Sequence, residues 1–180
     1  MSLQHLWAGW RSTYIVEATE RERAGGISHE AHECVFCHLV KSGAPSEDNL
    51  VVWRGELSFV VMNAYPYASG HMLVLPLRHV GSLSELTPEE SAAVWSATQD
   101  AIAAAETAFD PDGLNMGANL GRAAGAGIPA HVHLHVVPRW SGDTNFMTSI
   151  GETRVLPEPL PHSWKKLVAA WPDQPASSGH

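Results

Sequence analysis

Three histidines alternate with apolar residues in the segment His131-Val132-His133-Leu134-His135. In a β-strand, side chains two positions apart lie on the same face. The pattern therefore predicts a strand with three imidazoles on one side and the intervening apolar residues towards the core. Imidazole is a metal ligand and a nucleophile near neutral pH. This spacing indicates metal binding or nucleophilic catalysis, and the plain alternative is a half-exposed strand whose polar positions happen to be histidine.

The geometry of a strand limits the metal interpretation. Three consecutive residues on one face span roughly 13 Å, whereas a metal–nitrogen bond is about 2 Å long. Two of the histidines can reach one ion, but all three cannot. In nucleophilic catalysis, one imidazole attacks while its neighbours position a phosphate or a leaving group.

The loop before the histidines favours phosphate chemistry. Its sequence, "NMGANLGRAAGAGIP", contains Asn115, Asn119 and a cluster of glycines that includes Gly125 and Gly127. Small residues let backbone N–H groups approach a phosphate closely. A glycine-rich loop alone is a weak signal, but beside three histidines it indicates a phosphate site.

The only two cysteines form a C-x-x-C pair, Cys34 and Cys37. A redox role is disfavoured because no thioredoxin-like βαβ pattern surrounds the pair, and two buried free thiols are the plain alternative. We expect zinc, which takes four nitrogen or sulfur ligands in structural sites. The nearby candidate ligands are His29, His32 and His38.

Strands must position most of these residues. Two β-rich runs within residues 48–63 flank Arg54-Gly55-Glu56 and predict a hairpin. The runs "HMLVLP" and "LNMGAN" predict two further strands. Because the strands neighbour one another in sequence, we expect an α+β fold with a mainly antiparallel sheet.

One long helix is predicted between the strands. The sequence Thr87-Pro88-Glu89-Glu90 combines an N-cap, a proline in the first turn and a capping box, and the helix should run to about Phe109. Apolar spacing also predicts short helices near both ends of the chain. The residues on the predicted faces are Leu3, Leu6, Trp7 and Trp10 at the start, Trp95, Thr98, Ile102 and Ala105 in the long helix, and Trp164, Leu167, Val168 and Trp171 at the end, within about residues 162–171.

Composition narrows the class of protein. The chain has 180 residues, of which 44% are hydrophobic and 17% charged, as expected of one soluble globular domain spanning residues 1–180. The formal charge of −8 and the lack of a basic run disfavour nucleic-acid binding. No apolar stretch approaches the roughly 20 residues that span a bilayer, and the first residues do not resemble a signal peptide. We therefore expect a cytoplasmic protein with no nucleic-acid or membrane partner.

The segment from His131 to Val137 resembles the H-φ-H-φ-H-φ-φ signature of the histidine triad (HIT) family of nucleotide hydrolases and transferases. The upstream "GHMLVLPLRH" is similar to another element of that family. "AGAGIPAHVHLHVVPRWSGDTNFM" resembles a bacterial branch of HIT hydrolases and diadenosine tetraphosphate phosphorylases. The resemblance covers roughly residues 34–151, which leaves residues 1–33 as an N-terminal extension.

The resemblance implies a homodimer of α+β domains that holds a nucleotide beside the triad. His133 would attack the α-phosphate of a dinucleoside polyphosphate or related nucleotide and form a nucleotidyl-histidine intermediate. His135 would donate a hydrogen bond to the phosphate or the leaving group, and His71 would support it. The resemblance further implies nucleotide contacts from Asn63, Asn119, Trp140 and Asn145.

The resemblance also completes the zinc site. HIT members with this C-x-x-C pair take two further ligands from the fold, which here are His79 and His131, so Cys34, Cys37, His79 and His131 would hold a structural zinc ion. Only one histidine of the triad would then bind metal, which leaves the other two for chemistry.

One departure from the family and two alternatives bear on function. Many members carry Ser or Thr shortly before the triad, where residues 125–130 here have no hydroxyl. Either backbone N–H groups replace it or the acceptor preference differs. The alternatives to the nucleotidyl-histidine enzyme are a non-catalytic nucleotide-binding module and a metal-dependent hydrolase.

Overall fold

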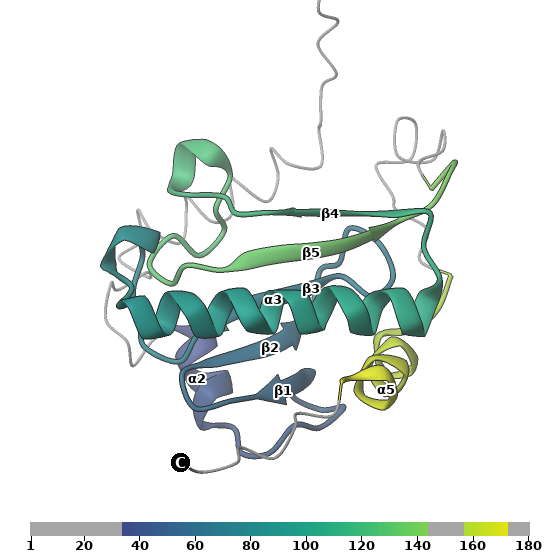
Figure 1. Ribbon diagram of the computed structural model, residues 1–180, viewed down its shortest axis with the longest axis horizontal. Coiled ribbons are helices and arrows are strands. Elements are labelled where there is room, and N and C mark those ends of the chain that lie inside the picture. The colour runs from purple at the N-terminus through teal and green to yellow at the C-terminus, as the bar shows by residue number, and fades with distance from the viewer. Residues whose placement is uncertain (1–33, 144–156, 173–180) are drawn as a thin grey trace, which may run out of the picture.

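The computed structural model describes residues 34–143 and 157–172. Five strands form one antiparallel sheet in the order β1-β2-β3-β5-β4 (Figure 1). The strands are β1 (Val51–Arg54), β2 (Ser58–Met62), β3 (Met72–Pro76), β4 (Gly113–Gly117) and β5 (Leu134–Arg139). The α-helices among these residues are α2 (Val35–Lys41), α3 (Pro88–Phe109) and α5 (Leu160–Ala170). The predicted α+β fold is confirmed, and the helix predicted within residues 3–10 lies outside the described residues.

The central strands are buried on both faces because the sheet lies between helices. Val60, Met62 and Val74 pack in a core cluster with residues of α3 and Leu167 of α5. Their neighbours Phe59 and Val61 pack with Phe36 of α2 in a second cluster. Figure 1 shows α3 and α5 in front of the sheet and α2 behind it. Along these central strands, alternate side chains therefore pack into two different cores, one on each face of the sheet.

The strands that carry the predicted chemistry are central, while β4 lies at one edge of the sheet that the described residues form. β3 pairs with β2 on one side and with β5 on the other, and Leu73 of β3 faces His135 of β5. Residues that face each other across a ladder lie on the same side of the sheet. His135 therefore lies on the face that α2 covers, because Leu73 belongs to the α2 cluster.

The predicted hairpin and the start of the long helix are both confirmed. The Gly55 N–H donates to the Ser58 carbonyl where β1 turns into β2. At the start of α3, Thr87 Oγ1 accepts from the Glu90 N–H at 3.2 Å, and a Glu90 carboxylate oxygen accepts from the Thr87 N–H at 2.9 Å. This reciprocal capping box satisfies backbone donors at a helix start.

Glu90 also binds a side chain outside its helix. Two nitrogens of the Arg78 guanidinium donate to the two Glu90 carboxylate oxygens at 2.7 Å. Arg78 immediately precedes His79, so this bidentate pair ties the loop after β3 to α3. The hydrogen bonds from Arg78, followed by that from the Thr87 N–H, lower the pKa of Glu90 to about 2.

The predicted buried face of α3 is partly wrong. Trp95 is 53% exposed, whereas Thr98 and Ala105 are buried. The helix packs on the sheet mainly through a stripe of small residues: Ala97, Ala101, Ala104 and Ala105. A helix with such a stripe lies close to the sheet, and the large Trp95 ring lies outside this contact.

Helix α2 was not predicted from the sequence. It has seven residues, and no side chain caps its N-terminus. A distant strand secures its other end, because the Arg54 guanidinium of β1 donates to the carbonyls of Leu39 and Val40. Unpaired carbonyls at a helix C-terminus are good partners for such a cation.

The predicted C-terminal helix is confirmed as α5, although it begins slightly earlier, at Leu160. Trp164 donates its indole N–H to the Val51 carbonyl of β1 at 2.8 Å. Just beyond the helix, Trp171 stacks on Trp53 with the ring centroids 5.6 Å apart. These contacts fix α5 against the β1 edge of the sheet.

Within residues 34–143 and 157–172, no helix is both long enough and apolar enough to cross a bilayer.

Replacing Glu90 by Gln should lower the free energy of unfolding at neutral pH by about 1–3 kcal/mol, the usual range for hydrogen bonds to charged groups. The pKa of Glu90 is below its ordinary value, so its stabilisation is complete above about pH 4.5 and is lost as the pH falls towards 2. Urea titrations of wild type and Glu90→Gln should therefore differ at pH 7 and converge near pH 2. Glu89→Gln, at the exposed neighbouring position, is the matched control, and a Glu90→Gln loss no larger than its loss would contradict this role.

Candidate active site and metal site

Four potential metal ligands come together from three separate parts of the chain. Cys34 and Cys37 lie at the start of α2, His79 lies in the loop after β3, and His131 precedes β5. Their ligand atoms all lie within 4.8 Å of one another. His131 Nδ1 is 3.6 Å from Cys34 Sγ and 3.7 Å from Cys37 Sγ, and His79 Nδ1 is 3.3 Å from Cys37 Sγ. The four residues are close enough to bind a metal ion.

The hydrogen bonding of His131 leaves its Nδ1 available to bind a metal ion. Its Nε2 lies 3.0 Å from the Pro76 carbonyl, which can only accept, so Nε2 carries the proton. Nδ1 therefore presents its lone pair to the two thiols. Burial lowers the pKa of His131 to about 4 and, with the neighbouring Cys34, raises that of Cys37 to about 11. A bound cation would compensate for burying thiolates here, and two sulfurs with two nitrogens suit a metal that prefers soft ligands.

A hydrogen bond fixes His133 in the tautomer whose Nε2 has a lone pair. Its Nδ1 lies 2.9 Å from the backbone carbonyl of His131, so Nδ1 donates and Nε2 keeps its lone pair. The side chain is 7% exposed, and the Phe36 ring lies 5.3 Å from the imidazole. Burial lowers the pKa of His133, which favours the neutral imidazole. A neutral imidazole with a free Nε2 is the nucleophilic form of histidine.

The predicted triad strand is shorter than expected. β5 begins at Leu134, so only His135 lies within the strand, and His131 and His133 lie in the segment before it. That segment bonds to the loop after β3, because the Val132 N–H donates to the Val80 carbonyl at 2.7 Å. His131 is fully buried, not half-exposed. The departure from the sheet separates the His131 side chain, in the group of four potential metal ligands, from the side chains of His133 and His135.

His135 and His71 form a hydrogen-bonded pair beside His133. His71 Nε2 lies 2.9 Å from His135 Nδ1, and the ring of His135 is centred 5.1 Å from that of His133. Burial, then the neighbouring His133, lowers the pKa of His135 to about 4. Its Nε2 is buried and has no hydrogen-bond partner among the described residues. Such an orphaned polar atom is costly, and in an active site it indicates a place for a ligand.

Gly70 is required where the chain enters this site. Its φ is +75°, and a Cβ would lie 2.5 Å from the Phe109 ring. Only glycine meets both conditions without strain, so the Gly-His sequence places His71 through backbone geometry.

The structure places one of the predicted nucleotide contacts beside the histidines, and three others lie in the loop that leads to the triad. Asn63 lies beside His71, with its amide nitrogen 3.4 Å from His71 Nδ1. Asn119, Gly125 and Gly127 are half-buried in the loop between β4 and the triad. Gly125 ends a short 3₁₀ turn with φ +91°.

Trp140 is not brought to the histidines, and Asn145 lies outside the described residues. The Trp140 ring packs against Phe109, with the centroids 6.5 Å apart. It follows His135 by five residues, which corresponds to about 16 Å along a strand.

Reasoning from the residues alone missed Tyr67 as a site residue. Its backbone N–H donates to His71 Nδ1 at 3.0 Å, and its ring stacks 5.9 Å from that of His135. Tyr67 lies in "AYPYASG", whose turn-forming residues indicate only a connection between strands. The short distance in sequence to His71 was the available signal.

Comparison with known proteins identifies the class to which this fold and site belong. The model of the HIT domain family matches residues 44–142. The chain belongs to the HIT family, and it is a nucleotide hydrolase or transferase of that family.

Individual relatives are similar to most or to part of the chain. A Mycobacterium tuberculosis protein named AP-4-A phosphorylase is 40% identical over 173 residues, covering 96% of this chain and 87% of the relative. A Dictyostelium discoideum protein named bis(5'-adenosyl)-triphosphatase is 38% identical over 89 residues, covering 49% of this chain and 59% of its own length. The crystal structure of a Zn-bound histidine triad family protein from Mycobacterium smegmatis superposes with a TM-score of 0.63 at 32% identity, covering 78% of this chain and 94% of the other.

Proposed function

We propose that this protein cleaves the bond between the α-phosphate and the rest of a dinucleoside polyphosphate or related nucleotide through a covalent nucleotidyl-His133 intermediate. The observation that carries the proposal is that two neighbouring imidazoles have Nε2 atoms suited to different roles, one to attack the substrate and the other to contact it. His133 has a free Nε2 because its Nδ1 is bonded to the His131 carbonyl. Beside it, His135 has a buried Nε2 without a partner among the described residues.

The first step uses these two atoms. His133 Nε2 attacks the α-phosphorus while the bond from phosphorus to the leaving oxygen breaks, and the electron pair departs with that oxygen. The His133 ring becomes positively charged, which the His131 carbonyl stabilises by accepting from Nδ1–H. In the second step, water or another acceptor attacks the same phosphorus and the imidazole leaves. Splitting one displacement into two lowers each barrier.

The nucleotide contacts remain part of this proposal. Asn63 would bind ribose beside His71, and Asn119 with the N–H groups near Gly125 and Gly127 would bind phosphate. Support comes from the contact of Asn63 with His71 and from the half-buried positions of the other residues in the loop that leads to the triad. Trp140 and Asn145 would contact substrate further from the reacting phosphate. Because of its distance from His135, Trp140 can serve only a distal part of an extended substrate or the site of a second copy.

A product assay tests the proposed activity. Diadenosine tetraphosphate is incubated with and without orthophosphate, and products are separated by chromatography. Wild type should form AMP and ATP by hydrolysis or ADP and ATP by phosphorolysis, and His133→Ala should lose roughly 10³-fold or more of the turnover because no covalent step remains. The exposed His162→Ala is the matched control.

Two outcomes would contradict the proposal. Turnover retained in His133→Ala would exclude the covalent step on that residue. Tight nucleotide binding without turnover of any nucleotide by wild type would instead identify a non-catalytic binding module.

The proposal includes a structural zinc ion held by Cys34, Cys37, His79 and His131. The proximity of the four ligand atoms supports it, as does the lone pair of His131 Nδ1, which faces the two thiols. Bound here, zinc would have four protein ligands and would supply stability, because a closed site leaves no position for a reacting water. It would join α2, the loop after β3 and the segment before β5.

Elemental analysis tests the zinc site. Wild type purified without chelators should contain about one zinc per chain. Cys37→Ser and His79→Ala should lose it and melt at lower temperature, since metal binding contributes directly to folding free energy. His38→Ala, an exposed histidine on the same helix, should retain the metal.

Wild type without metal would contradict the zinc site. Activity lost on chelation while the protein stays folded would favour the metal-dependent hydrolase.

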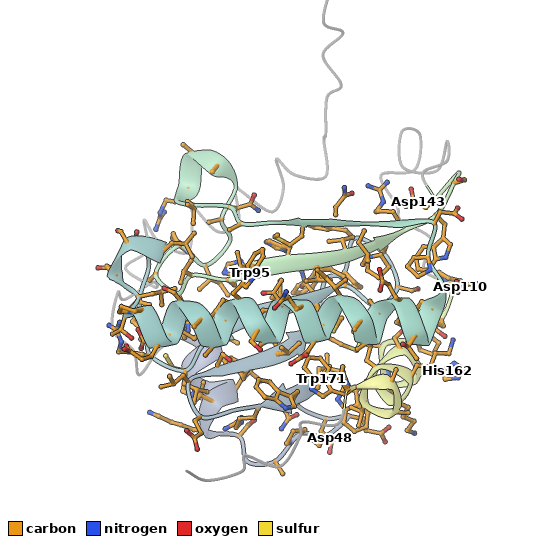
Figure 2. All side chains as sticks on the ribbon, viewed as in Figure 1. Asp48, Trp95, Asp110, Asp143, His162 and Trp171 are labelled. Atoms are coloured by element: carbon orange, nitrogen blue, oxygen red, sulfur yellow. The ribbon has the colours of Figure 1, made fainter. Side chains whose placement is uncertain are left out.

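We also propose that two copies associate through the β4 edge and α3. β4 has a partner on one side only among the described residues, and free strand edges pair readily. Met116 faces the α3 side of the sheet opposite Val136, and it is 45% exposed. Figure 2 places the exposed Trp95 along the side of α3 nearer to β4 than to β1. A second copy pairing its own β4 would cover both side chains by twofold symmetry.

Light scattering after size exclusion tests this association. Wild type should have the mass of a dimer, and Trp95→Glu with Met116→Asp should give a folded monomer. Leu57→Glu, an exposed apolar position near the opposite edge of the sheet, should remain dimeric. A monomeric wild type would contradict the interface.

The remaining parts of the proposal concern location and partners. Both cysteines are free, and reduced thiols persist in the cytoplasm, where we place the protein. The net charge of −8 supports the absence of nucleic-acid partners.

A further inference from the structure

The two cysteines lie in the same short segment as an aromatic ring that packs on the proposed nucleophile. Cys34 is the N-cap of α2, and Cys37 lies in its first turn. Between them, Phe36 is buried, and its ring is centred 5.3 Å from that of His133 and 5.5 Å from that of His131. Any movement of this turn therefore moves a ring that lies against His133.

A second neighbour of His133 belongs to the cysteine–histidine cluster, which consists of Cys34, Cys37, His79 and His131. His133 Nδ1 donates to the His131 carbonyl at 2.9 Å. The side chain of the same His131 places Nδ1 3.6 Å from Cys34 Sγ and 3.7 Å from Cys37 Sγ. Two of the groups that orient the His133 imidazole, a ring and a carbonyl, are therefore attached to the residues around the thiols.

The two thiols are placed to react with each other. Both are free and buried, and their sulfur atoms lie within 4.8 Å of each other. They are the only cysteines of the chain. A disulfide needs Cβ atoms about 3.5–4.5 Å apart, whereas residues three apart in an α-helical turn have Cβ atoms about 5–6 Å apart. Forming a disulfide between Cys34 and Cys37 therefore distorts the first turn of α2.

The opposite end of α2 is fixed. The Arg54 guanidinium of β1 donates to the carbonyls of Leu39 and Val40 in the last turn. The helix has only seven residues, and no side chain caps its N-terminus. A displacement caused by a disulfide is therefore concentrated in the first turn, where Phe36 lies.

We propose that Cys34 and Cys37 form a thiol switch for the covalent step at His133, and that a hydroperoxide such as hydrogen peroxide oxidises it. The inference rests on the proposed function and names its regulation. In the reduced state, the Phe36 ring and the His131 carbonyl both hold the His133 imidazole. In the disulfide state, the distorted turn displaces these groups and moves His133 Nε2 away from the line of attack on the α-phosphorus. Misplacement of a reacting atom by about 1 Å can slow a reaction by about 10²-fold.

The oxidation balances with the hydroperoxide alone. One thiolate attacks an oxygen of hydrogen peroxide, the oxygen–oxygen bond breaks, and a sulfenic acid and one water form. The second thiolate attacks that sulfur, the sulfur–oxygen bond breaks, and the oxygen leaves as a second water. The two sulfurs lose two electrons to the peroxide. The two protons come from the thiols or, where a metal ion has displaced them, from solvent. The disulfide has no thiolate left to serve as a metal ligand.

Oxidation of the wild-type protein as purified tests the switch. Protein with and without a small excess of hydrogen peroxide is compared by thiol titration after denaturation, by intact mass and by zinc release. Peroxide should remove two thiols per chain, form one internal disulfide and release the zinc that the protein carries. The kcat for diadenosine tetraphosphate should fall by roughly 10- to 10²-fold, while KM stays nearly unchanged. Dithiothreitol with added zinc should restore kcat.

A spectroscopic signature separates the switch from a general loss of structure. Long-range ¹H–¹⁵N correlation of ¹⁵N-histidine-labelled protein shows which ring nitrogen carries the proton. His133 should show the Nδ1–H pattern in the reduced protein and a changed pattern in the oxidised protein, while the exposed His162 keeps its signals. Circular dichroism should stay native. An oxidised protein that unfolds would overturn the proposal, because a switch requires a folded inactive state.

The double variant Cys34→Ser, Cys37→Ser is the matched control for oxidation elsewhere. It cannot form the disulfide but retains all five methionines, so peroxide should leave its own remaining activity unchanged. If this variant does not fold, reversal in wild type decides, because dithiothreitol reduces a disulfide readily and leaves methionine sulfoxide to its dedicated reductases.

Three outcomes would overturn the switch and leave the proposed function standing. They are thiols that stay reduced in peroxide, undiminished kcat once the disulfide has formed, and inactivation that dithiothreitol and zinc do not reverse. No turnover of any nucleotide by the reduced wild type would instead refute the proposed function itself.

Discussion

The site depends on the double attachment of His131. Its ring points into the cluster of thiols and His79, and its Nε2 is bonded to the Pro76 carbonyl at the end of β3. Its backbone carbonyl accepts from His133 Nδ1. One residue therefore connects the four potential metal ligands and sets the tautomer of His133. Any shift of the cysteine–histidine cluster moves the carbonyl that orients His133.

One face of the sheet carries a hydrophobic core, and the other face carries the candidate site. On one face, α3 and α5 cover the core residues of β2, β3 and β5. On the other face, α2 brings Phe36 against His133 and the cysteines against His131. α2 is only seven residues long, and a helix of that length is not stable alone. Arg54 contacts one end of α2 and the cysteine–histidine cluster contains the other end. Contacts with the rest of the fold therefore stabilise the short helix.

Sequence predicted the elements whose signals are local. The capping box of α3 lies within four residues, and the β-rich apolar run from Phe59 to Met62 lies within one strand, so both can be recognised in the sequence. α2 was missed because its stabilising partner, Arg54, is 14 and 15 residues from the carbonyls that it binds. The start of β5 was misplaced because the Val80 carbonyl, which draws Val132 out of the sheet, cannot be inferred from the alternation.

In the candidate site, too, local motifs could be predicted from the sequence and long-range contacts could not. The triad and the C-x-x-C pair are compact motifs, whereas His79 and His131 were assigned as their partners through family resemblance alone. The contacts span 42 residues in one case and 94 to 97 in the others. Spacing within a single sequence carries no information on such pairs. The backbone N–H of Tyr67 is equally invisible, because every residue except proline has one.

The central claim is that His133 Nε2 becomes covalently bonded to the α-phosphorus of the substrate. The most direct measurement mixes enzyme with diadenosine tetraphosphate, quenches in alkali, where a phosphorus–nitrogen bond to histidine survives, and maps the modified peptide by mass spectrometry. One adenylyl group on His133 is expected within the first turnover. Turnover without an adduct, or an adduct on His71 or His135, would contradict it.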